Sequence, residues 1–60
     1  MKNQFEPNHG TITLLSESTA DVFLIGRLSV KFPRAPVISV GKGMKEIVID
    51  LDELLEAAAK

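Results

Sequence analysis

The sequence predicts a small α+β domain, in which an antiparallel sheet of about four strands is followed by one C-terminal helix. Short runs rich in β-branched residues recur along the chain, and two of them flank a turn with glycines. From Asp50 onward, the apolar residues recur with the period of a helix. We expect strands near residues 11–16, 22–32, 37–40 and 45–49 and a helix from 51 to about 59.

The length of 60 residues suits a single small domain over residues 1–60 and lies near the lower limit for folding alone. The chain has no cysteine and one histidine, so we expect neither a disulfide framework nor a zinc site. A domain of this size commonly depends on oligomerisation or on a partner for its stability. We therefore expect a homodimer, formed by sheet extension or by burial of one face against another.

The first ten residues, MKNQFEPNHG, are polar and follow no period. We expect them to form a loosely ordered N-terminal arm over residues 1–10. They lack the apolar core of a signal peptide. The apolar run VFLIG at 22–26 is far shorter than the roughly 20 residues of a membrane span. We expect a cytoplasmic protein without membrane contacts.

Residues 22–32, VFLIGRLSVKF, allow two interpretations. As a strand, the first half is apolar on both faces, the second half is apolar on one, and Gly26 marks a bulge or bend. As a helix, the run begins at Ser18 or Thr19, but its β-branched residues and Gly26 lower the helix propensity. Because of this low helix propensity, the strand is the favoured interpretation of residues 22–32. A single short helix covers such a sheet incompletely, so Phe23 and Ile25 are the candidate oligomer surface.

A hairpin is expected where the runs VISV (37–40) and KEIVI (45–49) flank the sequence GKGM. The glycines are expected to supply positive φ angles in the turn. This G-x-G pattern lacks the third glycine and the helix of a dinucleotide site, and it lacks the G-K-S/T of a phosphate loop. Before the hairpin, PRAP (33–36) is interpreted as a connector, and a polyproline ligand is the alternative.

Asp50 and Asp52 form a D-x-D pair at the end of the second hairpin strand. The stretch IVIDLDE resembles the opening motif of haloacid dehalogenase-type phosphotransferases, in which the first Asp is a nucleophile and the second an acid-base residue. Glu53 and Leu54 stand where that family has Gly-Thr, and ten residues follow Asp50. Asp50 is instead expected to cap the C-terminal helix, with Glu53 completing a capping box and Ile49 and Leu54 forming a hydrophobic staple.

The charges divide the chain into segments of opposite sign. Residues 27–45 hold five cations and no acid, whereas residues 46–60 hold five acids and one lysine. The five cations are the candidate contacts to an anionic partner or to DNA: Arg27, Lys31, Arg34, Lys42 and Lys45. The alternative is ordinary surface charge that is balanced by the acidic helix.

Residues 32–58, FPRAPVISVGKGMKEIVIDLDELLEAA, resemble the second half of small phage excisionases and related prophage regulators. In that family a recognition helix ends at a Phe-Pro or Leu-Pro step, and a basic wing hairpin and a short helix follow. The resemblance implies a winged helix-turn-helix as the alternative fold, with Arg34, Lys42 and Lys45 near DNA phosphates. The residues before the Phe-Pro step have a β-like pattern where the family has its helix-turn-helix. Residues 46–60 also resemble the strand and first helix of ribbon-helix-helix antitoxins.

Two functions of different classes follow. The first is a small non-enzymatic protein-interaction or regulatory module that acts as a homo-oligomer, with an unidentified protein partner and a phage or mobile element as one candidate source. The second is a small DNA-binding regulator that uses the basic segment 27–45. No catalytic, cofactor-binding or metal-binding residue is expected, because the chain has a single imidazole and no Cys, Tyr or Trp.

Overall fold

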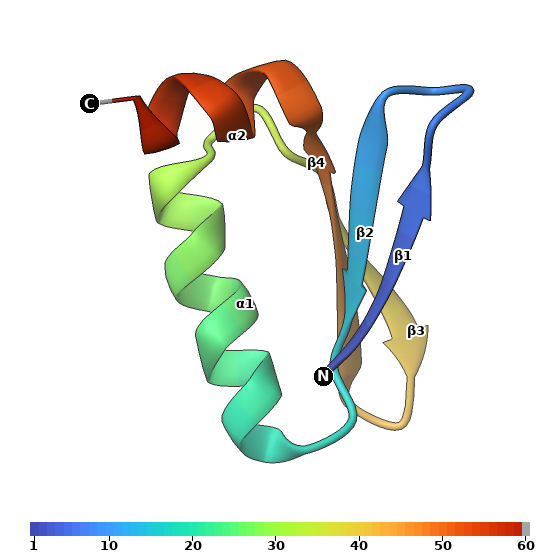
Figure 1. The fold of residues 1–60 in the computed structure, drawn as a ribbon. Coiled ribbons are helices and arrows are strands. Elements are labelled where there is room, and N and C mark those ends of the chain that lie inside the picture. Colours follow the sequence, from blue (N-terminus) through green and yellow to red (C-terminus); the bar gives the residue numbers. More distant parts are fainter. Residues whose placement is uncertain (60) are drawn as a thin grey trace.

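The computed structural model describes residues 1–59, which form a four-stranded antiparallel sheet and two helices (Figure 1). The elements are β1 (Lys2–Glu6), β2 (Thr11–Leu15), α1 (Thr19–Lys31), β3 (Val37–Gly41), β4 (Met44–Asp50) and α2 (Leu51–Ala58). The strands lie in the order β1-β2-β4-β3. The expected α+β class, with an antiparallel sheet of four strands and a C-terminal helix, is confirmed, and a second helix is added to it.

Strand β4 joins the two hairpins of the sheet. It pairs with β3 on one side and with β2 on the other, where Ile49 lies opposite Ile12 and Ile47 opposite Leu14. Because β2 and β3 are both antiparallel to β4, they run parallel to each other, and α1 carries the chain between them. Both helices lie on the same side of the sheet (Figure 1), and no described element covers the other face.

Residues 19–31 form the helix α1, so the strand expected at 22–32 is wrong. The helix begins at a cap, where the Ser18 side chain accepts a hydrogen bond from the Asp21 amide at 3.3 Å. Asp21 also places a carboxylate in the first turn, near the positive end of the helix dipole. The alternative interpretation, a helix from Ser18 or Thr19, is the correct one.

Core packing explains why this segment is helical despite its weak propensity. Ile25, Leu28 and Phe32 recur at helical spacing and belong to the apolar cluster between α1 and the sheet. Full burial of one such side chain contributes about 1.5–3 kcal/mol, whereas a glycine in a helix interior costs about 1 kcal/mol. Burial therefore outweighs propensity, and Gly26 lies inside the helix instead of at a bulge.

Residues 2–6 form the edge strand β1, where a loosely ordered arm was expected. The strand pairs with β2 through a turn in which the His9 amide donates to the Glu6 carbonyl oxygen at 3.1 Å. Gly10 ends the turn with a φ angle of 64°, which favours glycine. The Gly10 carbonyl oxygen accepts a hydrogen bond from the Leu51 amide at 2.9 Å, so the turn is also held to the start of α2.

The core is small and lies between the helices and one face of the sheet. Its buried apolar residues come from α1, the end of α1 and β4: Ile25, Phe32, Ile47 and Ile49. Partly buried side chains of β2 and α2 pack around them, among them Ile12, Leu14, Leu54 and Ala57. Because successive residues of a strand point to opposite faces, this core occupies only one face of the sheet.

Asp50 caps the helix α2, as expected. Asp50 Oδ1 accepts a hydrogen bond from the Asp52 amide at 2.8 Å, so the D-x-D pair spans a strand-to-helix junction. Leu54 packs against the cluster that contains Ile49, as a hydrophobic staple requires.

The expected hairpin of β3 and β4 is also confirmed. Its strands meet where Gly41 lies opposite Met44, which leaves Lys42 and Gly43 as the turn. These two residues have φ angles of 55° and 77°. Two successive positive φ angles are the mark of a type I′ turn, which matches the twist of the strands on either side.

Candidate interaction surface

The sheet face opposite the helices is uncovered and carries a mixed surface. The residues of the two central strands on this face include Thr11, Thr13, Leu15, Glu46, Val48 and Asp50. On β3, Ile38 lies opposite Glu46 on the same face and is 46% exposed. Ile38 and its diagonal neighbour Val48 are therefore apolar side chains near the β3 edge, with the acidic Glu46 between Ile38 and Leu15.

Strand β3 forms one edge of the sheet and has no charge along its length. Its five residues, VISVG, are all exposed. Edge strands of monomeric proteins commonly carry a charge, a proline or a bulge that discourages pairing with another chain. Pro36 precedes this strand, and the register is irregular between Ser39 and Gly41, but the centre of the strand is apolar. This edge is open to a further strand.

The backbone groups of Val37 and Ser39 point toward the free edge. In an antiparallel ladder, successive residues direct their N–H and C=O groups alternately to one side and to the other. The Val48 amide donates to the Pro36 carbonyl oxygen at 3.2 Å, so the groups of Pro36 and Ile38 face β4. The groups of the alternate residues, Val37 and Ser39, consequently face away from the sheet.

Hydrogen bonds on the far side of β4 agree with this alternation. Lys45, which pairs with Ser39, donates its amide to Ser16 Oγ at 2.8 Å and accepts from the Ser16 amide at 2.9 Å. Its backbone therefore faces β2, and the backbone of Ser39 faces the free edge. No local pattern in the sequence marks the buried Ser16, because its role depends on the register of segments 29 residues apart. The Lys45 ammonium donates to Ser39 Oγ at 2.7 Å.

The five candidate contacts to an anionic partner lie in two groups. Arg27 and Lys31 are four residues apart on the exposed side of α1, and Arg34 follows the helix. Lys42 is in the β3-β4 turn, and Lys45 follows it on β4. This turn lies near the N-terminal end of α1, whereas Lys31 and Arg34 lie at the C-terminal end (Figure 1). A helix of 13 residues is about 20 Å long, and Lys31 lies at the end of α1 that is distant from the second group. The structure does not gather the five cations into one patch.

Of the two side chains expected at an oligomer surface, only Phe23 is exposed. Phe23 is 71% exposed on α1, whereas Ile25 is 1% exposed and belongs to the core. Residues two apart on a helix lie about 200° apart around its axis, so the two cannot share a face. Ile25 is therefore corrected from a surface residue to a core residue. Val30, which is 82% exposed, lies on the same side of α1 as Phe23.

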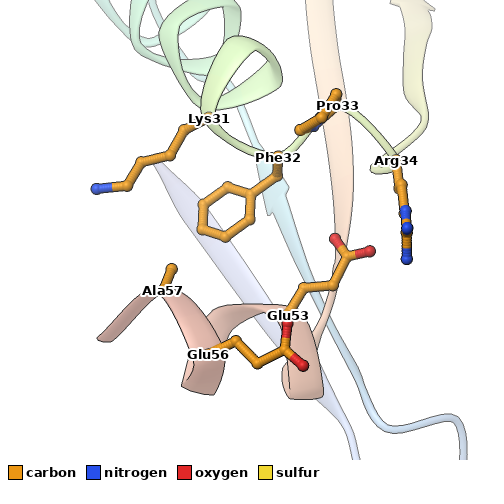
Figure 2. Close-up of a pocket in the computed structure, with 7 residues that line it drawn as sticks. All are labelled: Lys31, Phe32, Pro33, Arg34, Glu53, Glu56 and Ala57. Atoms are coloured by element: carbon orange, nitrogen blue, oxygen red, sulfur yellow. The ribbon is translucent and has the colours of Figure 1, made fainter. Parts of the chain in front are cut away.

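A groove lies between the C-terminal end of α1 and the helix α2 (Figure 2). Its walls are Lys31, Phe32, Pro33, Arg34, Glu53, Glu56 and Ala57. Glu53, expected in a capping box with Asp50, lines this groove. The charged side chains are of both signs and do not converge on one point in Figure 2, whereas a ligand site needs a few convergent polar groups.

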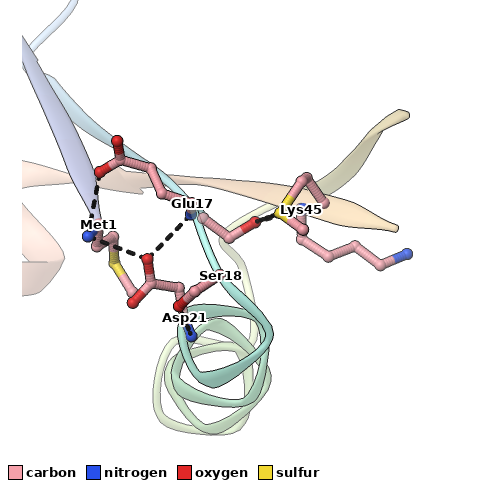
Figure 3. Close-up of polar contacts among 7 residues, drawn as sticks. Met1, Glu17, Ser18, Asp21 and Lys45 are labelled. Carbon is pink, nitrogen blue, oxygen red and sulfur yellow. Dashed lines mark hydrogen bonds and ion pairs between the residues drawn. The ribbon is translucent and has the colours of Figure 1, made fainter. Parts of the chain in front are cut away.

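An ion cluster ties the start of β1 to the start of α1 (Figure 3). The Met1 amino group lies 3.2 Å from Glu17 Oε1 and 3.0 Å from Asp21 Oδ2. Asp21 Oδ2 also accepts a hydrogen bond from the Glu17 amide at 2.9 Å. This hydrogen bond, together with the amino group, lowers the pKa of Asp21. Asp21 and, secondarily, Glu17 raise the pKa of the Met1 amino group.

Among residues 1–59, no three His, Cys, Asp or Glu side chains lie close enough together to hold a metal ion. Within the same range, neither helix has the length and apolar character needed to cross a membrane. No protein-family model, curated protein or solved structure matches the chain.

Proposed function

We propose that the chain is a small non-enzymatic module that binds protein, and that it acts as a homo-oligomer through the β3 edge. The observation that carries the proposal is the centre of β3, where Val37 and Ser39 direct their backbone groups outward and Ile38 is exposed. Edge-to-edge strand pairing is a recurrent mode of protein binding, in which backbone hydrogen bonds supply affinity and alternate side chains supply specificity.

The exposed area of the chain supports the same proposal. The accessible surface is 4416 Å², whereas a monomeric protein of this mass exposes about 3,800 Å². The excess of about 600 Å² approaches the roughly 800 Å² that one partner contributes to a standard interface. A protein bound along the edge and the uncovered face would bring the exposed surface into the ordinary range.

Light scattering across the micromolar range tests the proposal. The expected particle has twice the mass of the 6.5 kDa chain. Phe23→Ser distinguishes the β3 edge from the exposed apolar residues of α1, and is expected to leave the particle mass unchanged. A wild-type mass that stays at 6.5 kDa contradicts the homo-oligomer, and dissociation caused by Phe23→Ser contradicts the assignment to β3.

Binding to duplex DNA is the second candidate, favoured by the basic side of α1. Arg27 and Lys31 share that side, and Arg34 follows the Phe-Pro step that the excisionase resemblance places after a recognition helix. Phosphate contacts make such binding weaken steeply as salt rises. A salt titration with duplex DNA tests it: steep salt dependence supports this candidate, and no binding at about 50 mM salt rejects it.

A further inference from the structure

We infer that two copies of the chain pair through β3 in one specific register, with Ile38 of each copy at the two-fold axis. The inference rests on the proposed function and adds to it the register in which two copies of the chain meet. In this register the backbone groups of Val37 bond those of Ser39 in the other copy, and Ile38 lies opposite Ile38.

The free backbone groups decide this register. A two-fold axis between identical antiparallel strands requires that if residue i faces residue j of the other copy, then j faces i. Opposite residues in a hydrogen-bonded pair exchange both N–H and C=O groups. Placing Val37 opposite Ser39 pairs every outward group of these two residues, once on each side of the axis. The strand is therefore complementary to itself.

Neighbouring registers leave groups unmatched. With Val37 on the axis, Ser39 would lie opposite Ala35, whose amide already donates to the Phe32 carbonyl oxygen at 3.0 Å. With Ser39 on the axis, Val37 would lie opposite Gly41, beyond the irregularity that separates Ser39 from Gly41. Only the register centred on Ile38 uses the regular part of the strand.

The side chains agree with the same register. Ile38 would form a non-hydrogen-bonded pair with its copy, in which the Cα atoms are about 4.5 Å apart and the side chains are in close contact. No charge lies on β3, so strand pairing places no like charges opposite each other within it. Beyond the strand, the register directs Lys42 of each copy toward Arg34 of the other, and this pair of exposed cations opposes the association by an amount that salt reduces.

Single cysteines test the register directly, because the natural chain has none. Ile38→Cys places two cysteines opposite each other with Cα atoms about 4.5 Å apart, within the Cα range that a disulfide spans, so mild oxidation is expected to yield a covalent dimer. Val40→Cys is the matched control, since the two copies of residue 40 would lie on opposite sides of the axis and about 13 Å apart. Both positions are equally exposed, at 46%, and circular dichroism checks that both variants fold.

The outcomes separate this inference from the proposed function. Rapid cross-linking of Ile38→Cys, with little of Val40→Cys, supports the register. If the wild-type chain is dimeric but Val40→Cys cross-links as fast as Ile38→Cys, the register is wrong and the proposed function stands. If the wild-type chain is monomeric at every micromolar concentration, the proposed function fails and the register fails with it.

Amide exchange supplies a second test that needs no variant. Raising the protein concentration is expected to slow the exchange of the Val37 and Ser39 amides at least tenfold, because dimerisation gives both a carbonyl partner. The outward amides of β1, at Asn3 and Phe5, are expected to keep their exchange rates. Protection at Asn3 and Phe5 in place of Val37 and Ser39 overturns the inference.

Discussion

The two edges of the sheet present the same backbone chemistry but differ in the side chains around it. By the alternation of the ladder, β1 directs the amides of Asn3 and Phe5 outward, as β3 does those of Val37 and Ser39. Strand β1 has a lysine at one end and a glutamate at the other, whereas β3 has no charge. The two edges therefore differ in side-chain charge and not in the availability of backbone hydrogen bonds, and charge is what commonly discourages an edge strand from pairing with another chain.

Adding a charge to β3 should remove the difference in charge between the two edges and weaken the dimer. Of the predicted changes, this one is expected to have the largest effect. Ile38→Lys places two like charges opposite each other at the axis and removes two buried apolar side chains, so the dissociation constant should rise about 100-fold or more. Gln4→Lys is the matched control, in the middle of the other edge strand and on the same face of the sheet. Sedimentation measures both variants, and equal effects would contradict the comparison.

Ser16, which follows β2, bonds Lys45 of β4 and so links the two hairpins of the sheet. Because Ser16 lies on neither edge strand, this link can be weakened without a change at either edge. Ser16→Ala leaves the amide of Lys45 without its side-chain acceptor, and should lower the free energy of unfolding by about 1–3 kcal/mol. Ser39→Ala, at an exposed serine that also contacts Lys45, should change it by less than about 0.5 kcal/mol. Urea denaturation at one protein concentration compares the two, and similar losses would show that Ser16 is not a structural link.

The turn between β3 and β4 can be stabilised by a substitution at Lys42. Lys42 has a φ angle of 55°, which asparagine tolerates better than lysine and which suits the first position of a type I′ turn. Lys42→Asn should raise the free energy of unfolding by about 0.5–1 kcal/mol, measured by thermal or urea denaturation. Lys2→Asn, the same change at the β1 edge, should give no gain. A loss of stability in Lys42→Asn would argue against this turn geometry.

The smallest expected effect is a pH dependence that belongs to the β1 edge alone. The folded-state pKa of Asp21 is lowered from 3.8, so its stabilisation is present above pH 3.8 and is lost as the pH falls through the lowered value. The pKa of the Met1 amino group is raised from 8.0, so its stabilisation is present below pH 8.0 and is lost as the pH rises through the raised value. Residues 37–41 contain no titratable side chain.

Amide exchange, corrected for intrinsic rates, measures this dependence. Protection of the β1 amides that bond β2 is expected to be greatest between pH 3.8 and pH 8.0 and to decrease on either side, relative to the β3 amides that bond β4. Asp21→Asn should remove the decrease on the acid side. Parallel pH profiles for the two edges would show that the ion cluster does not hold β1.

Local patterns in the sequence were sufficient to predict the β3-β4 hairpin and the helix cap at Asp50. In both cases the interacting residues are within a few positions of one another, so the sequence contains the whole determinant. The helix α1 had such a signal too, since Ser18 is followed by an acidic residue at Asp21. The apolar residues of this segment fit a period of two as well as a helical period, and tertiary burial of Ile25 and Phe32 decided between them.

Strand β1 and the open edge could not be predicted in the same way. The sequence KNQFE has one apolar side chain, and it becomes a strand because β2 offers a partner. The exposure of β3 depends on the strand order β1-β2-β4-β3, which arises from contacts between distant segments. Had β3 paired on both sides, the same VISV run would be an interior strand and would offer no free edge.

The position of β4 in the sheet also shapes how the chain reaches its fold. This strand is the last of the four to be synthesised, yet it lies between β2 and β3 and supplies the buried Ile47 and Ile49. Until residues 44–50 are available, β2 and β3 have no strand to join them and α1 has little to pack against. The bonds between β2 and β4 close a loop of about 30 residues, and such distant pairing slows folding. A nascent chain therefore exposes two additional strand edges until β4 enters the sheet.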